Sequence, residues 1–224
     1  MKWSVAYGET VLNIECDTDL RSEVLDEVVA NYTQLLNHIH KNPLFLSSYE
    51  PIEASEDDPG IVRMMCDASA RCGVGPMAAV AGTFSEIVGR KIHESTSEYI
   101  VDNGGDIYMS TGMEKVVGVH TPSERFSDKI RFLIDSSETP LGICSSSSKI
   151  GHSVSMGSAD TVVAFSDSAA VADAAATAIA NSVKGPDSLG SCISQASCIR
   201  GLRGILIIVG DEMGAYGRLP KIVG

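Results

Sequence analysis

Aromatic side chains, positive charge and long apolar runs are all scarce in this chain of 224 residues. It contains one Trp, six Tyr and five Phe, so we expect a core built mainly from Ala, Val, Ile, Leu and Met. The 17 Lys and Arg residues face 29 Asp and Glu residues, which gives a formal net charge of −12. A field of that sign repels polyanions and excludes nucleic acid as an expected partner. No run approaches 18 uncharged apolar residues, so no transmembrane helix is predicted.

The N-terminal residues and the cysteines indicate a cytoplasmic protein. The first 17 residues alternate polar and apolar side chains and lack the apolar segment and cleavage site of a secretory signal. Six cysteines without a CxxC motif are too few for a disulfide scaffold, and we expect them to be reduced core residues. With 44% hydrophobic and 21% charged residues, the composition is typical of a globular protein.

The hydrophobic pattern predicts an α+β fold in which an antiparallel sheet packs against helices. Residues 3–7 and 11–16 flank a Gly-containing turn, which indicates a hairpin. Helical spacing and end signals predict helices over 20–41, 61–72, 77–93, 169–181 and 188–200. Strand candidates separated by turn signals lie at 98–101, 107–109, 115–120, 129–135, 141–144 and 161–165, with a further apolar run at 205–209. Helices grouped before a run of strands favour α+β over a regular βαβ array.

The acidic residues are concentrated near the N-terminus. Residues 1–60 carry twelve acidic and three basic side chains, so the rest of the chain is almost neutral. We expect one domain over residues 1–224, with an acidic hairpin and helix in 1–58 and a ligand-binding portion in 59–224. The net charge therefore does not argue against a small anionic ligand.

Asp173 and Thr177 are candidate ligands for a divalent cation. They lie four residues apart in an Ala-rich segment, so a helix would project the carboxylate and the hydroxyl from one face. Hard oxygen ligands suit Mg²⁺, which commonly takes one or two protein oxygens and completes its shell with water and ligand phosphates. The alternative is a surface Asp beside a Thr that bonds back to its own helix.

Three polar turns are candidates for contacts with an anion. Residues 73–78 match a GxGxxG/A pattern, but a helical segment precedes them, so a Rossmann fold is not predicted. That turn still presents backbone N–H groups at the start of a helix. Gly104-Gly105 allow positive φ in a hairpin turn, and serines 145–148 with Lys149 offer hydroxyls and a cation. The plain alternatives are a helix–helix turn, a hairpin turn and a polar loop.

The order of these features resembles that of the ApbE superfamily. The segments that carry the resemblance are 75–81, 101–107, 145–147 with His152, and 172–178. Over residues 60–180 the chain is similar to FAD:protein FMN transferases, which have a T-fold. Over nearly its whole length it is similar to a branch found in archaea and anaerobic bacteria.

The resemblance implies a flavin nucleotide site with Mg²⁺. In the transferases the metal promotes transfer of FMN from FAD to a protein threonine, with release of AMP. By this resemblance Asp173 and Thr177 would bind the metal. The remaining implied contacts with FAD or FMN fall on Gly75, Asn103, Gly104, Gly105, Asp106, Ser145, Ser146, Ser147 and His152. Where the transferases have Lys-Gly, this chain has Gly75-Pro76, so a cationic contact is missing.

Other functions are also compatible with the sequence. The archaeal and anaerobe branch is associated with sulfide use and homocysteine formation, so a non-enzymatic partner or carrier in anaerobic sulfur assimilation is the alternative. Ser153 begins like the nucleophile elbow of hydrolases but lacks the last glycine of that motif, which leaves a Ser-His-Asp hydrolase as a weaker alternative. A homodimer is compatible with either function.

Overall fold

The computed structural model describes residues 1–127, 129–147 and 157–223, and its main feature is an antiparallel sheet. Within those residues the sheet has eight strands, and neighbouring strands pair throughout in antiparallel register. In spatial order the strands are β1 (Lys2–Tyr7), β2 (Thr10–Cys16), β3 (Tyr99–Asn103), β4 (Asp106–Ser110), β7 (Leu141–Ser146), β8 (Thr161–Ser166), β9 (Leu202–Val209) and β10 (Glu212–Gly217).

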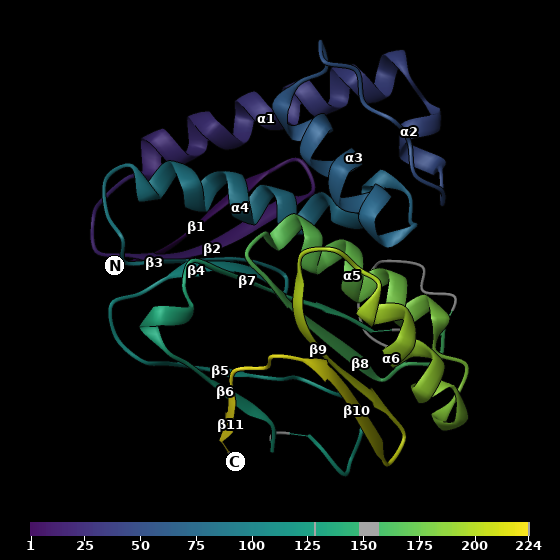
Figure 1. Ribbon diagram of the computed structural model, residues 1–224. Helices are drawn as coiled ribbons and strands as arrows, with labels where there is room; N and C mark the ends of the chain where they lie inside the picture. Colours follow the sequence, from purple (N-terminus) through teal and green to yellow (C-terminus); the bar gives the residue numbers. More distant parts are fainter. Residues whose placement is uncertain (128, 148–156, 224) are drawn as a thin grey trace.

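Helices cover one face of this sheet, and a smaller sheet covers part of the other (Figure 1). The longer helices are α1 (Arg21–Lys41), α3 (Gly60–Cys72), α4 (Val80–His93), α5 (Ala169–Ser182) and α6 (Leu189–Ser197). The short ones are α2 (Leu44–Ser47) and the 3₁₀ helices η1 (Pro76–Ala79), η2 (Ser136–Glu138) and η3 (Pro186–Ser188). The small sheet contains β11 (Lys221–Val223), β6 (Arg131–Ile134) and β5 (Lys115–Gly118).

Two apolar cores hold the layers together. The larger lies between the helices and the sheet, and Ala side chains of α5 let that helix pack closely on β7 and β8. The smaller lies between the two sheets, where the rings of Phe132 and Phe165 meet edge to face with centroids 4.8 Å apart. Strand β8 is buried along its whole length because it contributes to both cores. Small aliphatic residues thus supply most of the interior, as the shortage of aromatics predicts.

Local signals in the sequence explain where the helices near the site begin and end. Gly73 adopts a left-handed conformation (φ 69°) at the end of α3. This conformation is unfavourable for residues that carry a Cβ. Pro76 then starts η1, and α4 follows directly. Gly104 and Gly105 have φ of 68° and 105° and close the β3–β4 hairpin as predicted.

The structure adds elements that the sequence pattern did not predict. Helix α2 and strands β10 and β11 are absent from the predicted elements, because each is short or half-exposed and shows weak periodicity. Five cysteines are buried as expected, but Cys198 is exposed, so the expectation of six core cysteines is wrong for that residue. Among the described residues, no helix has the length and apolar character needed to cross a membrane.

Candidate functional site

A cavity of about 670 Å³ lies where the start of α4, the middle of α5 and the ends of β4 and β7 meet. Its volume is in the range of small-molecule sites. Several segments line it. They contribute Leu46–Tyr49, Cys72–Gly75, Met77, Ala78, Val80, Ala81, Asp106, Ser145, Ser146, Asp173, Thr177, Ala178, Asn181, Ser182 and Gln195. Segments that are far apart in the sequence therefore meet at one cavity.

Asp173 is the most firmly held carboxylate of the cavity. It lies on α5 and is 8% exposed, and its Oδ2 accepts a hydrogen bond of 2.8 Å from the backbone N–H of Gly82 in the first turn of α4. Burial raises the pKa of this carboxyl to about 7, although hydrogen bonds from the Gly82 and Ala81 amides lower it in part. The helix start thus supplies partial positive charge to a group that is otherwise poorly solvated.

Asp106 is the second carboxylate and has an unmatched oxygen. Its Oδ1 is buried and has no hydrogen-bond partner among the described residues. Burial raises its pKa well above the ordinary value, and the charge of Asp173 raises it further. Hydrogen bonds from the Cys144 side chain and the Ser145 backbone act in the opposite direction. A buried acceptor without a donor is costly, and here it lies beside a second negative charge.

A divalent cation fits this pair of carboxylates. The described residues contain no cluster of three or more His, Cys, Asp or Glu side chains, so a site built entirely from such ligands is not present in them. Mg²⁺ does not require one, because it commonly takes one or two carboxylates and fills its other positions with water and phosphate. Asp106, Asp173 and the Thr177 hydroxyl are oxygen donors at one cavity wall.

The Gly-Gly turn adjoins the cavity and contacts the serine segment. Gly105 donates its N–H to Asp102 Oδ1 at 2.8 Å, and its carbonyl accepts from Ser145 Oγ at 3.4 Å. A Cβ on Gly105 would lie 2.9 Å from that same Ser145 Oγ. Asn103 donates from Nδ2 to the Ala81 carbonyl at 3.3 Å, which ties the hairpin to the start of α4. The turn is therefore attached to both neighbouring walls.

The predicted site residues separate into three groups. Those that line the cavity are Gly75, Asp106, Ser145, Ser146, Asp173 and Thr177. Asn103, Gly104, Gly105 and Ser147 lie in the adjoining hairpin and strand end and are not among the described lining residues. His152 lies outside the described residues, as does Ser153.

The wall formed by Leu46–Tyr49 was not predicted as part of the site. The sequence showed only a polar acidic loop from residue 49 onward, typical of a solvated connection. No local sequence signal identifies the wall, because the contact that defines it is tertiary: a Cβ on Gly75 would lie 1.8 Å from the Ser48 carbonyl oxygen. The absence of a side chain at Gly75 is what lets the α2 segment close the cavity.

Replacing Gly75 by Ala should therefore cost stability. The backbone of Gly75 (φ −72°, ψ 157°) suits any residue, so the expected loss of about 1–3 kcal/mol in urea unfolding comes from the clash with Ser48. Gly60→Ala is the matched control, because a Cβ at Gly60 meets nothing within 4 Å. Equal stability of the two variants would show that the segment 46–49 can move aside freely.

Comparison with known proteins identifies the family. A family model described as AbpE bacteria matches residues 1–197. A UPF0280 protein of Methanothermobacter thermautotrophicus is 40% identical over 225 residues, with 98% of this chain and 86% of that protein covered. A UPF0280 protein of Methanobrevibacter smithii is 41% identical over 218 residues, with 94% and 92% covered. The chain belongs to the ApbE-like superfamily, in the branch of the UPF0280 proteins.

Solved ApbE structures share the fold of this ApbE-like protein. The ApbE protein of Thermotoga maritima matches with a TM-score of 0.64 at 10% identity, covering 96% of this chain and 97% of that one. The flavin transferase ApbE of Vibrio cholerae matches with a TM-score of 0.58 at 14% identity, covering 96% of each chain. These identities are too low to carry function, but they confirm the predicted ApbE-like fold of helices on an antiparallel sheet.

Proposed function

We propose that this ApbE-like protein binds a flavin nucleotide or a related phosphate-containing ligand together with Mg²⁺, and transfers the phosphate-linked group to an acceptor. The observation that carries the proposal is a pair of carboxylates at a cavity of about 670 Å³: Asp173, which is buried, and Asp106, whose Oδ1 is buried. Without a cation these groups repel each other, and one oxygen lacks a partner. A cation would remove both costs at once.

The charges of the cavity make a phosphate-containing ligand dependent on that cation. The lining residues within the described ranges include the two carboxylates and neither Lys nor Arg. A pyrophosphate would meet negative charge at close range, where electrostatic interactions are stronger than in water. Bound Mg²⁺ would neutralise phosphate oxygens and stabilise the charge that develops at the transferring phosphorus.

The protein's own residues would bind and orient the ligand. Asp106, Asp173 and Thr177 would hold the cation, while Gly82 keeps the Asp173 carboxylate in place through its amide. Ser145 and Ser146 would donate hydroxyl hydrogen bonds to phosphate oxygens, and the Gly104–Gly105 backbone allows a flat ligand to approach closely. Apolar and aromatic atoms elsewhere in the lining, including those of Tyr49 and Met77, would exclude water.

Transfer of FMN from FAD is the reaction we propose for this arrangement. An acceptor hydroxyl oxygen would form a bond to the FMN phosphorus while the bond from that phosphorus to the bridging oxygen of AMP breaks. AMP leaves with the bridging oxygen, and the acceptor hydroxyl releases its proton to solvent. The Vibrio cholerae protein that shares this fold is a flavin transferase, which supports this reaction class.

Calorimetric titration with FAD tests the proposal directly. We expect binding in the presence of Mg²⁺ and at least a 100-fold weaker affinity in EDTA, because the lining then offers the pyrophosphate two acidic side chains and neither Lys nor Arg. Riboflavin, which has no phosphate, is the control and should show little dependence on Mg²⁺. Absence of FAD binding with Mg²⁺ present, or equal binding in EDTA, would overturn the proposal.

Three of the buried thiols, including the one at the cavity, give little support to the alternative role in sulfur transfer. Burial raises the pKa of Cys66 to about 11 and that of Cys72, at the cavity wall, to about 12. Burial also raises the pKa of Cys144 well above its usual value. The reactive form of a cysteine is the thiolate, which is scarce at such pKa values. The proposed function therefore rests on oxygen ligands and phosphate chemistry.

A further inference from the structure

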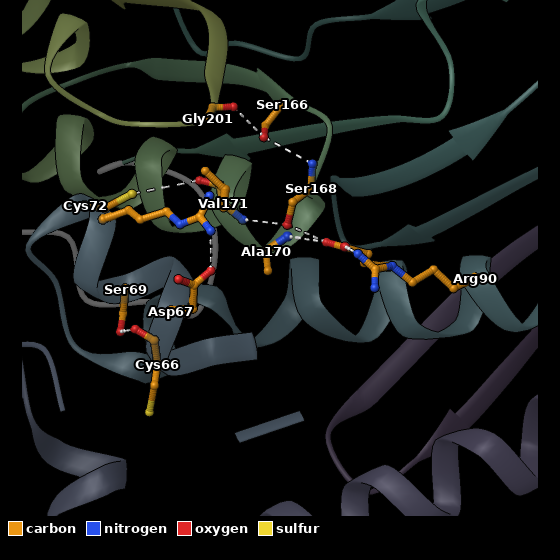
Figure 2. A network of polar contacts seen from close by, with 12 residues as sticks. Cys66, Asp67, Ser69, Cys72, Arg90, Ser166, Ser168, Ala170, Val171 and Gly201 are labelled. Carbon is orange, nitrogen blue, oxygen red and sulfur yellow. Dashed lines mark hydrogen bonds and ion pairs between the residues drawn. The ribbon is translucent and has the colours of Figure 1, made fainter. Parts of the chain in front are cut away.

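A fully buried carboxylate outside the cavity contacts the helix that carries Asp173 and Thr177. Glu86 on α4 is 0% exposed. Its Oε2 accepts hydrogen bonds from Ser168 Oγ at 2.6 Å and from the Ala170 N–H at 3.1 Å, and its Oε1 pairs with Arg90. Figure 2 labels Ser168, Ala170 and Arg90, and dashed lines mark their contacts with this carboxylate. A buried charge costs free energy unless it is well paired, and these contacts supply the pairing.

Glu86 holds the first turn of α5. Ser168 is the N-cap of that helix, and its Oγ accepts from the Val171 N–H at 3.4 Å while donating to Glu86. The carboxylate and the serine thus satisfy amides that a helix start leaves without intrahelical partners. The negative charge of Glu86 also complements the positive end of the dipole of this 14-residue helix.

In a second contact between these helices, α4 provides the hydrogen-bond donor and α5 the acceptor. Gly82, one helical turn before Glu86, donates its N–H to Asp173 Oδ2 at 2.8 Å. A Cβ on Gly82 would lie 2.3 Å from the Ala169 carbonyl oxygen, so the two helices touch there. Gly82 and Glu86 share one face of α4, because residues four apart in a helix are neighbours. Two contacts one turn apart restrict both sliding and rotation of α5.

We propose that Glu86 is a positioning residue for the cavity: it fixes the register of α5 on α4, so that Asp173 meets the start of α4 and Thr177 faces the cavity. That Asp173 binds a cation rests on the proposed function, but the positioning of α5 on α4 does not. Glu86 acts through α5 and does not line the described cavity wall.

Hydrogen exchange of the Gly82 amide in metal-free protein tests this positioning. In Glu86→Gln we expect Gly82 to exchange at least 10-fold faster than in Val88→Ala, and Mg²⁺ affinity to fall about 10-fold, as for other residues that support metal ligands. Val88 is also buried on α4, but it points to a different side of the helix from Glu86. Its substitution therefore reports the effect of lost stability alone.

Ser168→Ala provides a second route to the same answer if Glu86→Gln does not fold. It removes the hydroxyl that donates to Glu86 and should also raise the Gly82 exchange rate beyond that of Val88→Ala. If Gly82 exchange in the folded variants only follows global stability, as in Val88→Ala, Glu86 has no positioning role. Failure of the unmodified protein to bind Mg²⁺ would instead overturn the proposed function. The hydrogen exchange of metal-free protein would still decide whether Glu86 positions α5.

Discussion

Asp173→Asn should abolish Mg²⁺-dependent ligand binding while making the metal-free protein more stable. The amide has the shape of the carboxylate and can still accept the Gly82 hydrogen bond, so the substitution removes charge with little change in packing. Loss of one buried anionic ligand should weaken Mg²⁺ binding about 100-fold or more, on the scale of breaking a buried ion pair. Calorimetry with Mg²⁺, alone and with FAD, measures the loss.

The gain in stability follows from the same burial. The pKa of about 7 means that the folded protein holds the ionised Asp173 at a cost near neutral pH. An uncharged side chain should therefore raise the free energy of unfolding in EDTA by about 1–3 kcal/mol and Tm by about 3–8 °C at pH 7.5. A residue whose replacement stabilises the fold but removes binding is one that serves function at the expense of stability.

Asp187→Asn is the control for this substitution. Asp187 is exposed in η3 and does not line the described cavity, and its replacement changes the net charge by the same amount. We expect neither Mg²⁺ affinity nor Tm to change appreciably. Unchanged Mg²⁺ affinity in Asp173→Asn, or a clear loss of stability, would show that Asp173 is a structural acid and not a metal ligand.

Most of the fold near the cavity could be predicted from the sequence because strong local signals specify it. Gly73 and Pro76 mark the end of α3 and the start of η1, and Gly104-Gly105 mark the β3–β4 turn. The Asp173 to Thr177 spacing places both side chains on one helical face in any α-helix. The order of these segments carried the resemblance to the ApbE superfamily, and the family match confirms that family.

The contacts that position these residues could not be predicted, because they join segments far apart in the chain. Glu86 and Ser168 are 82 residues apart, and Gly82 and Asp173 are 91 residues apart. In the sequence Glu86 is one acidic residue in a helix, and nothing local shows that it is fully buried. Likewise the close packing of Gly75 on Ser48 depends on a tertiary approach that no periodicity reveals.

The stability of the metal-free protein should fall as pH rises from 5 to 8. Asp173 has a folded-state pKa of about 7 against an ordinary value of 3.8, so between these values the folded state binds more protons than the unfolded state. Stabilisation by the bound proton is fully present below the unfolded-state pKa and is lost as pH rises through the folded-state pKa. Asp106, whose pKa is also raised, contributes in the same direction.

Urea unfolding at a series of pH values in EDTA should show a loss of about 2–3 kcal/mol between pH 5 and pH 7 from Asp173 alone, since each pKa unit corresponds to about 1.4 kcal/mol. Asp173→Asn should remove that part of the slope, whereas the histidines are the same in both proteins. Saturating Mg²⁺ should flatten the profile of the unmodified protein, because a cation stabilises the ionised carboxylates that a proton otherwise neutralises. Identical slopes for the two proteins in EDTA would mean that the ionised Asp173 carboxylate is buried without cost, and this reason for binding a cation would then be absent.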